Sequence, residues 1–110
     1  MLLKTINNPK VFNQTKQFHE VDIPPLCPKT GNPSAGSTLT ITYVPDELML
    51  EVYSLNEYIA SFIGSNEVRD IELFTQVVAR DCHNILGVNV SVIGKLVLNI
   101  GQIVICECQN

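Results

Sequence analysis

Aromatic residues are scarce in this sequence, and basic residues form no cluster. Aromatic residues make up 6% of the 110 positions and tryptophan is absent, so Val, Ile and Leu must fill the core of a domain of this size. The formal net charge is −4, and no run of Lys or Arg occurs. Proteins that bind nucleic acid nonspecifically need a basic surface, and this composition excludes that class. Contact with a specific RNA through a shaped site is compatible with the composition.

Signals for membrane insertion, secretion and zinc binding are also missing. No stretch approaches the roughly 18 apolar residues of a membrane-spanning helix, and the opening sequence MLLKTINNPK offers no apolar segment long enough for a signal peptide. The spacings of the four cysteines match no zinc signature, so we expect no metal site. We expect a cytoplasmic protein without membrane contact, whose thiols stay reduced. The cysteines are Cys27, expected in a loop, Cys82 and Cys106, expected in the core, and Cys108, expected near a fraying end.

The segment LCPKTGNP, residues 26–33, combines a cysteine with the residues of a rigid loop. Gly31 permits a positive φ, whereas Pro28 and Pro33 fix φ and bias the residues before them towards extended geometry. These residues exclude a helix and disfavour a central strand, so we expect the segment to present Cys27 on a stiff loop. Two interpretations are open: a nucleophilic thiol, or a small buried hydrophobic residue in an ordinary loop.

Hydrophobic periodicity predicts the helices and strands that follow this loop. Residues 38–44 alternate polar and apolar side chains, as a half-buried strand does. Ser54-x-x-Glu57 is a capping-box pattern that opens a helix, and an apolar stripe marks a second, longer helix that Gly87 ends. The predicted elements are strands over residues 38–44 and 48–53, forming a hairpin, helices over 54–62 and 71–85, and strands over 88–92 and 96–106.

The predicted order, ββααββ, indicates an α+β fold with one antiparallel sheet and both helices on one face. We expect residues 1–23 to form an N-terminal arm with His19 exposed on it, and residues 24–110 to form a single domain. His83 is expected on the surface of the longer helix. The last predicted strand, residues 96–106, is apolar at nearly every position and needs cover on both faces. Because exposed apolar sheet is a liability, we expect an oligomer whose sheets close into a barrel, with sites between subunits.

Two segments carry a resemblance to a known family. LCPKTGNP (residues 26–33), followed by ITYVPDE (residues 41–47), resembles the NADPH-dependent 7-cyano-7-deazaguanine reductases of queuosine biosynthesis. The resemblance continues through Glu51-x-x-Ser54-Leu55 and Gly94-Lys95, and it covers roughly residues 24–106. It implies the tunnelling fold shared with GTP cyclohydrolase I, in which ββααββ domains assemble into barrels with active sites between subunits.

The resemblance implies a covalent mechanism with Cys27 as the nucleophile. In the family, the cysteine at this position adds to the nitrile of the substrate and forms a thioimide, which suits the strong nucleophilicity of a thiolate. Ser34 stands where the family has an acidic proton donor, and its hydroxyl is a far weaker acid. The family's substrate-binding glutamate matches Glu72, with Asp70 and Glu67 as weaker candidates. A carboxylate in the first turn of a helix is also stabilised by the helix dipole alone.

The resemblance also bears on the cofactor. The reductases hold the phosphates of NADPH with two lysines in the pattern Glu-x-Lys-x-x-Lys, and counting from Glu51 places Tyr53 and Asn56 at those positions. Loss of two charge-assisted contacts, about 1.5–3 kcal/mol each, argues against NADPH, so we expect no cofactor. The pattern is more similar to the archaeosine-forming amidinotransferases, in which ammonia attacks the thioimide. The expected substrate is a 7-deazaguanine base, either free or within transfer RNA or another nucleic acid.

Two other functions stay open. An NADPH-dependent reductase would need substitute cofactor contacts from Lys29, Lys95 or Arg80. A noncatalytic purine- or pterin-binding module would have kept the pocket and lost the acid. A covalent adduct on Cys27 would separate both enzymes from the module, and consumption of NADPH would separate the two enzymes.

Overall fold

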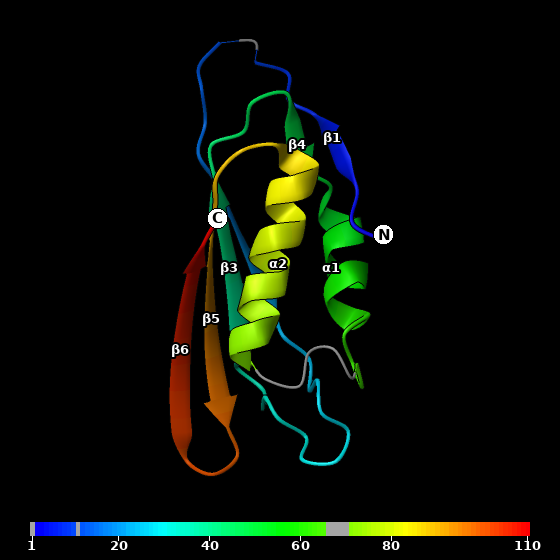
Figure 1. Ribbon diagram of the computed structural model, residues 1–110, viewed down its shortest axis with the longest axis vertical. Coiled ribbons are helices and arrows are strands. Elements are labelled where there is room, and N and C mark those ends of the chain that lie inside the picture. The colour runs from blue at the N-terminus through cyan, green and yellow to red at the C-terminus, as the bar shows by residue number, and fades with distance from the viewer. Residues whose placement is uncertain (1, 11, 66–70) are drawn as a thin grey trace.

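Strands flank a central pair of helices along the chain (Figure 1). The computed structural model describes residues 2–10, 12–65 and 71–110. The elements are β1 (Thr5–Asn7), β2 (Gln17–Asp22), β3 (Thr38–Tyr43), β4 (Leu48–Leu50), α1 (Val52–Ala60), α2 (Ile71–Leu86), β5 (Val90–Leu98) and β6 (Gln102–Gln109).

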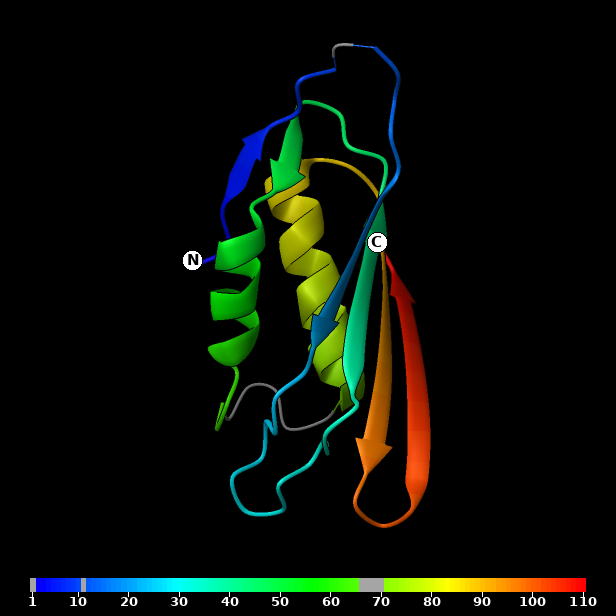
Figure 2. The same ribbon diagram turned by 180° about the vertical axis from the view of Figure 1, so that it is seen from behind.

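The strands form two antiparallel sheets. The larger sheet has the strand order β2-β3-β5-β6, and the smaller sheet pairs β1 with β4. Both helices lie on the same face of the larger sheet, as Figures 1 and 2 show from opposite sides. The expected α+β class with antiparallel strands is therefore confirmed.

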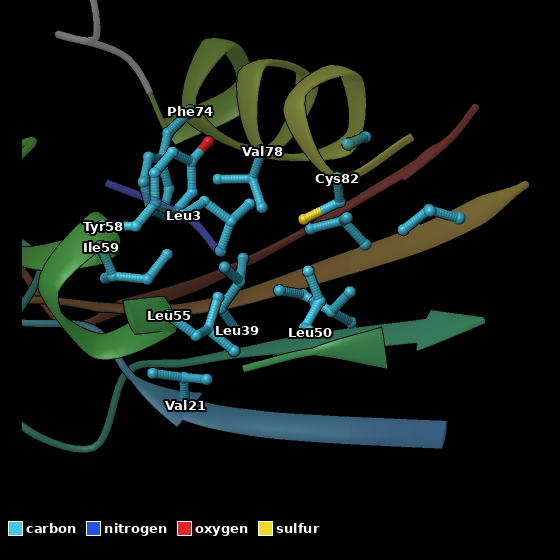
Figure 3. Packing of buried hydrophobic residues seen from close by; sticks show 14 of the residues in the cluster. Leu3, Val21, Leu39, Leu50, Leu55, Tyr58, Ile59, Phe74, Val78 and Cys82 are labelled. Carbon is cyan, nitrogen blue, oxygen red and sulfur yellow. The ribbon is translucent and has the colours of Figure 1, made fainter. Parts of the chain in front are cut away.

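The core fills the layer between the helices and the larger sheet (Figure 3). The predicted apolar stripe of α2 buries Phe74, Val78 and Cys82 completely, because three- and four-residue spacing places them on one face of the helix. They pack over side chains of the sheet such as Leu39, which is also fully buried. Each such side chain contributes about 1.5–3 kcal/mol through removal of apolar surface from water.

The predicted hairpin between residues 38–44 and 48–53 is wrong. β4 contains only three residues, and it pairs with β1 rather than with β3. The backbone N–H of Leu50 donates to the hydroxyl of Tyr43 at 2.9 Å, so a side chain occupies the donor that a hairpin partner would have used. Since Pro45 cannot donate to a ladder, the chain turns away from β3 and its next strand finds a partner in the N-terminal segment.

The predicted helix start at Ser54 is also wrong, because Glu51 caps α1. The Glu51 carboxylate accepts hydrogen bonds from the backbone N–H groups of Tyr53 and Ser54, both at 2.8 Å. These bonds lower the pKa of Glu51. Ser54 is buried inside the first turn, where its hydroxyl donates to the Glu51 carbonyl and accepts from the Lys4 N–H. The helix therefore begins earlier than the capping-box pattern indicates.

The C-terminal hairpin turns at residues 99–101, so the predicted single strand over residues 96–106 is wrong. β5 continues through Gly94, which lies where α2 packs closely on the sheet, and the chain reverses at Gly101 with φ +84. Half of the apolar run belongs to β5 and half to β6, and each strand packs only one face on the core. In β6 the outward side chains of Ile103 and Ile105 are 59% and 65% exposed.

The segment predicted as an N-terminal arm contributes two strands, β1 and β2, and β2 pairs with β3 in the larger sheet. The expectation that His19 is exposed is wrong. Its ring stacks on Tyr43, with the ring centroids 5.6 Å apart, and its Nε2 lies 3.0 Å from the Tyr43 hydroxyl. Burial lowers the pKa of His19. The imidazole lies on the inner face of β2, and its contacts with the buried Tyr43 help to hold β2 against the core.

Candidate active site

A short closed loop holds Cys27. We call residues 26–33 the Cys27 loop. The Gly31 N–H donates to the Cys27 carbonyl at 2.8 Å, and the N–H groups of Leu26 and Cys27 both donate to the Asn32 carbonyl at 3.0 Å. Gly31 has φ +71, a conformation that glycine adopts without strain. The stiff loop predicted from the sequence is therefore present, and the thiol of Cys27 is half-buried rather than enclosed.

The Cys27 loop is attached to two other parts of the molecule. The Gly64 N–H, beyond the end of α1, donates to the Leu26 carbonyl at 2.8 Å. On the other side, Asn99 in the β5–β6 turn hydrogen bonds to both Asn32 and Thr30. The loop thus lies beside the β5–β6 turn at one end of the larger sheet, the lower end in Figures 1 and 2.

The environment of Cys27 favours the thiolate. Its pKa is lowered first by the Thr30 hydroxyl, then by the backbone N–H groups of Thr30 and Lys29, and last by the positive charge of Lys29. Slight burial acts in the opposite direction. In contrast, burial raises the pKa of Cys82 to about 12, and burial together with the charge of Glu72 raises the pKa of Cys106. Of these three thiols, Cys27 is the one whose surroundings lower its pKa, and a lower pKa favours the nucleophilic thiolate.

Ser34 follows the loop directly, and its backbone is bonded to β5 just beyond the paired part of β3. The Ser34 N–H donates to the Val97 carbonyl at 2.7 Å, and the Ser34 carbonyl accepts from the hydroxyl of Ser37 at 2.8 Å. The Ser37 hydroxyl in turn accepts from the Val97 N–H at 2.9 Å. These contacts hold the position where the resemblance expects a proton donor. They add no acidic group to it, so a catalytic role of Ser34 stays a prediction.

Glu72 lies in the first turn of α2, with its side chain exposed. Its carbonyl accepts from the buried hydroxyl of Thr75 at 2.8 Å, which fixes this turn. The charge of Glu72 acts on Cys106 of β6, so the carboxylate lies near that strand. The other two candidates for base binding, Asp70 and Glu67, lie outside the described residues.

The surface expected to meet a dinucleotide carries no cation on α1. Tyr53 is 78% exposed there and Asn56 is exposed as well. Of the three substitute contacts, Arg80 already donates from Nε and Nη2 to the Asp81 carboxylate, at 3.2 and 3.1 Å. Lys29 and Lys95 are exposed. The α1 residues therefore do not fit the phosphates of NADPH.

Further features of the described residues bear on ligands. Among residues 2–10, 12–65 and 71–110, no group of three or more His, Cys, Asp or Glu side chains could hold a metal ion, and no helix is long and apolar enough to cross a membrane. An open hollow of about 450 Å³ lies at the far end of the sheet from the Cys27 loop, and it contains none of the predicted site residues. It is lined by Lys16, Thr42, Tyr43, Val44, Asn89, Val90, Ser91, Gln109 and Asn110.

Sequence reasoning missed two residues that shape the loop, Thr30 and Asn99. Thr30 lies inside the segment that the sequence singled out, and its hydroxyl next to a cysteine turn was a usable signal. Asn99 gave no local signal, because its partners Thr30 and Asn32 are 69 and 67 residues away.

Comparisons with known proteins confirm the resemblance. The chain is 39% identical over 61 residues to a protein of Rhodopirellula baltica named NADPH-dependent 7-cyano-7-deazaguanine reductase, a match that covers 54% of this chain and 50% of the relative. Proteins of the same name match in Nitrosospira multiformis, with 41% identity over 68 residues, 58% of this chain and 46% of the relative, and in Desulfovibrio desulfuricans, with 35% identity over 82 residues, 72% of this chain and 47% of the relative. The chain spans about half the length of these curated relatives. No family model matches the sequence.

Proposed function

We propose that this relative of the 7-cyano-7-deazaguanine reductases captures the nitrile of a 7-cyano-7-deazaguanine base on Cys27. The observation that carries the proposal is the half-exposed thiol in a closed loop, beside the Thr30 hydroxyl, two backbone N–H groups and Lys29. The thiolate sulfur forms a bond to the nitrile carbon, and the nitrile nitrogen takes up a proton, which gives a thioimide. Covalent capture divides a difficult addition into two easier steps.

The base is held by Glu72 in this proposal. A carboxylate accepts hydrogen bonds from adjacent N–H groups on the guanine-like edge of the base. The first turn of α2 offers a fixed support, since the buried Thr75 hydroxyl bonds to the Glu72 carbonyl. The proton for the nitrile nitrogen passes through the Ser34 hydroxyl or solvent.

The second step is attack on the thioimide by ammonia rather than by a hydride. Tyr53 and Asn56 support this choice, because neither offers a charge-assisted bond to a dinucleotide phosphate. The runner-up is reduction by NADPH, which the names of the relatives favour. The base is either free or carried in transfer RNA, and the free thiols fit a reducing, cytoplasmic setting.

The complete site in this proposal lies between subunits of a tunnelling-fold barrel. The order from β3 to β6 is ββααββ, and β6 has no strand on its outer side within the described residues. Ile103 and Ile105 are exposed on this strand, and Ile100 is exposed in the adjoining turn, whose Asn99 is bonded to the Cys27 loop. A second copy that covers this surface would also close the open side of the site.

Intact mass after incubation with 7-cyano-7-deazaguanine tests the capture step. We expect the mass to rise by one base, the adduct to map to Cys27, and Cys27→Ala to form none while the matched variant Cys108→Ala forms it normally. Glu72→Gln should need a higher base concentration. Base binding without an adduct would leave a noncatalytic module as the function.

The second reactant is identified with the adduct in hand. Ammonia should release an amidine product, and NADPH should not be consumed, with the base supplied free and within transfer RNA in parallel. Consumption of NADPH in step with loss of the nitrile would restore the reductase as the function.

A further inference from the structure

Asn99 makes three hydrogen bonds to the Cys27 loop. Its backbone N–H donates to Asn32 Oδ1 at 3.0 Å, and its Oδ1 accepts from Asn32 Nδ2 at 3.2 Å. Its Nδ2 donates to the Thr30 carbonyl at 2.8 Å. Two of these bonds use the Asn99 side chain, one as acceptor and one as donor, and an amide is the group that can do both. We call these three bonds the Asn99 clasp.

Thr30 is the residue that links the Asn99 clasp to the sulfur. The Thr30 hydroxyl oxygen accepts from the Asn32 N–H at 3.3 Å, and this hydroxyl is the largest influence that lowers the pKa of Cys27. The Thr30 N–H also lowers the pKa of Cys27, and the next residue, Gly31, closes the turn between them by donating to the Cys27 carbonyl at 2.8 Å. The positions of the hydroxyl and the N–H both depend on how Thr30 is placed. Asn99 bonds to the Thr30 carbonyl, and the Asn32 N–H bonds to the Thr30 hydroxyl.

We propose that Asn99 is a positioning residue, which keeps the hydroxyl and N–H of Thr30 against the sulfur of Cys27 from a turn distant in the sequence. The proposal rests on the proposed function, in which Cys27 is the nucleophile. Asn99 touches neither the sulfur nor the base, and it acts through Thr30.

The clasp lies on the surface, so its loss can be separated from loss of the fold. Asn99 and Thr30 are both exposed, and the clasp bonds are outside the apolar core. The loop also keeps its internal bonds between residues 26, 27, 31 and 32 when Asn99 is changed. A substitution at Asn99 should therefore loosen Thr30 while the loop and the domain stay folded.

The test is the pH profile of Cys27 alkylation by iodoacetamide, measured on the whole protein by peptide mass spectrometry without any base present. We expect Asn99→Ala to lower the rate at neutral pH roughly tenfold, the lower end of the effect of one hydrogen bond to a charged group, and to move the midpoint of the profile to higher pH. Asn99→Asp should do the same, because it keeps the acceptor for Asn32 and loses the donor to Thr30. Asn84→Ala, an exposed change on α2, serves as the control.

Two Thr30 variants show whether the effect passes through that residue. Thr30→Ser should keep the wild-type midpoint, since it retains the hydroxyl, and Thr30→Val should move the midpoint to higher pH. A wild-type profile for Asn99→Ala overturns the proposal, as does a rate change of equal size at every pH, which would report only altered access to the sulfur.

The assay also separates this proposal from the function on which it rests. A shifted profile together with no nitrile adduct would refute the proposed function alone. An unshifted profile together with a normal adduct would refute the role of Asn99 alone.

Discussion

Replacing Gly94 with alanine tests the close packing between α2 and the larger sheet. A Cβ at this buried position would lie 2.9 Å from Thr75 Cγ2 and 3.4 Å from Leu96 Cδ1. The Thr75 side chain cannot easily turn away, because it is β-branched and its hydroxyl is bonded to the Glu72 carbonyl. The added methyl group must therefore push α2 away from β5 or distort the first turn of the helix.

The expected cost follows from two opposing effects. Overpacking of a well-filled core costs about 1–3 kcal/mol. Removing a glycine from a position that alanine can adopt stabilises the protein by about 0.4–1 kcal/mol, through the entropy of the unfolded chain. The net loss in the free energy of unfolding should lie between about 0 and 2.6 kcal/mol, with a central value of about 1.3 kcal/mol.

Urea unfolding followed by circular dichroism measures this loss, and a second variant identifies its cause. Thr75→Ser removes Cγ2, keeps the hydroxyl bond to Glu72 and costs about 1 kcal/mol for a buried methyl group. In the Thr75→Ser background, Gly94→Ala should cost at least about 0.5 kcal/mol less than in the wild type, since the clash is gone. Equal costs in the two backgrounds, or a Gly94→Ala variant more stable than the wild type, would refute the steric argument.

Two further predictions concern pH and assembly. Burial lowers the pKa of His19 below its ordinary value of 6.5, so the unfolded chain takes up the proton first. The stability that neutral His19 contributes is therefore fully present above pH 6.5, and it is lost as the pH falls from 6.5 towards the lowered pKa of the folded state. Urea unfolding of His19→Gln should show a smaller loss of stability than the wild type over this pH range. Identical pH slopes would contradict this account. For assembly, light scattering of the wild type should show an oligomer, and Ile105→Lys should reduce its mass, because a charge replaces an exposed apolar side chain on β6. Ile63→Lys, an exposed change beyond α1, should leave the mass unchanged, and a monomeric wild type would exclude both the barrel and a site between subunits.

The parts of the fold that the sequence predicted are those fixed by local pattern. The stripe through Phe74, Val78 and Cys82 is long enough for its period to identify a helix and its buried face. The β5–β6 turn escaped prediction because the residues on both sides of it are apolar and common in strands, and Gly101 was a weak signal for the reversal. The pairing of β4 with β1 is a contact between distant segments, which no local pattern encodes.

In the site, too, local sequence pattern was predictable and contacts between distant segments were not. The Cys27 loop was predictable because the prolines fix φ at their own positions and Gly31 permits the positive φ of the turn. The hydrogen bonds that lower the pKa of Cys27 depend on how Thr30 turns, and that orientation depends in part on Asn99. The position of Glu72 relative to β6 depends on how α2 packs on the sheet. The sequence therefore predicted Glu72 as a candidate but not its proximity to Cys106.

The Asn99 clasp has a consequence for the newly made protein. Asn99 leaves the ribosome long after Asn32, 67 residues later in the sequence, so an emerging chain has the Cys27 loop before it has the turn that holds Thr30. On the proposal that Asn99 positions Thr30, Cys27 lacks one of the influences that lower its pKa during that interval, so its thiol is less reactive than in the folded protein. The alkylation rate of Cys27 would therefore report whether the β5–β6 turn has docked on the Cys27 loop.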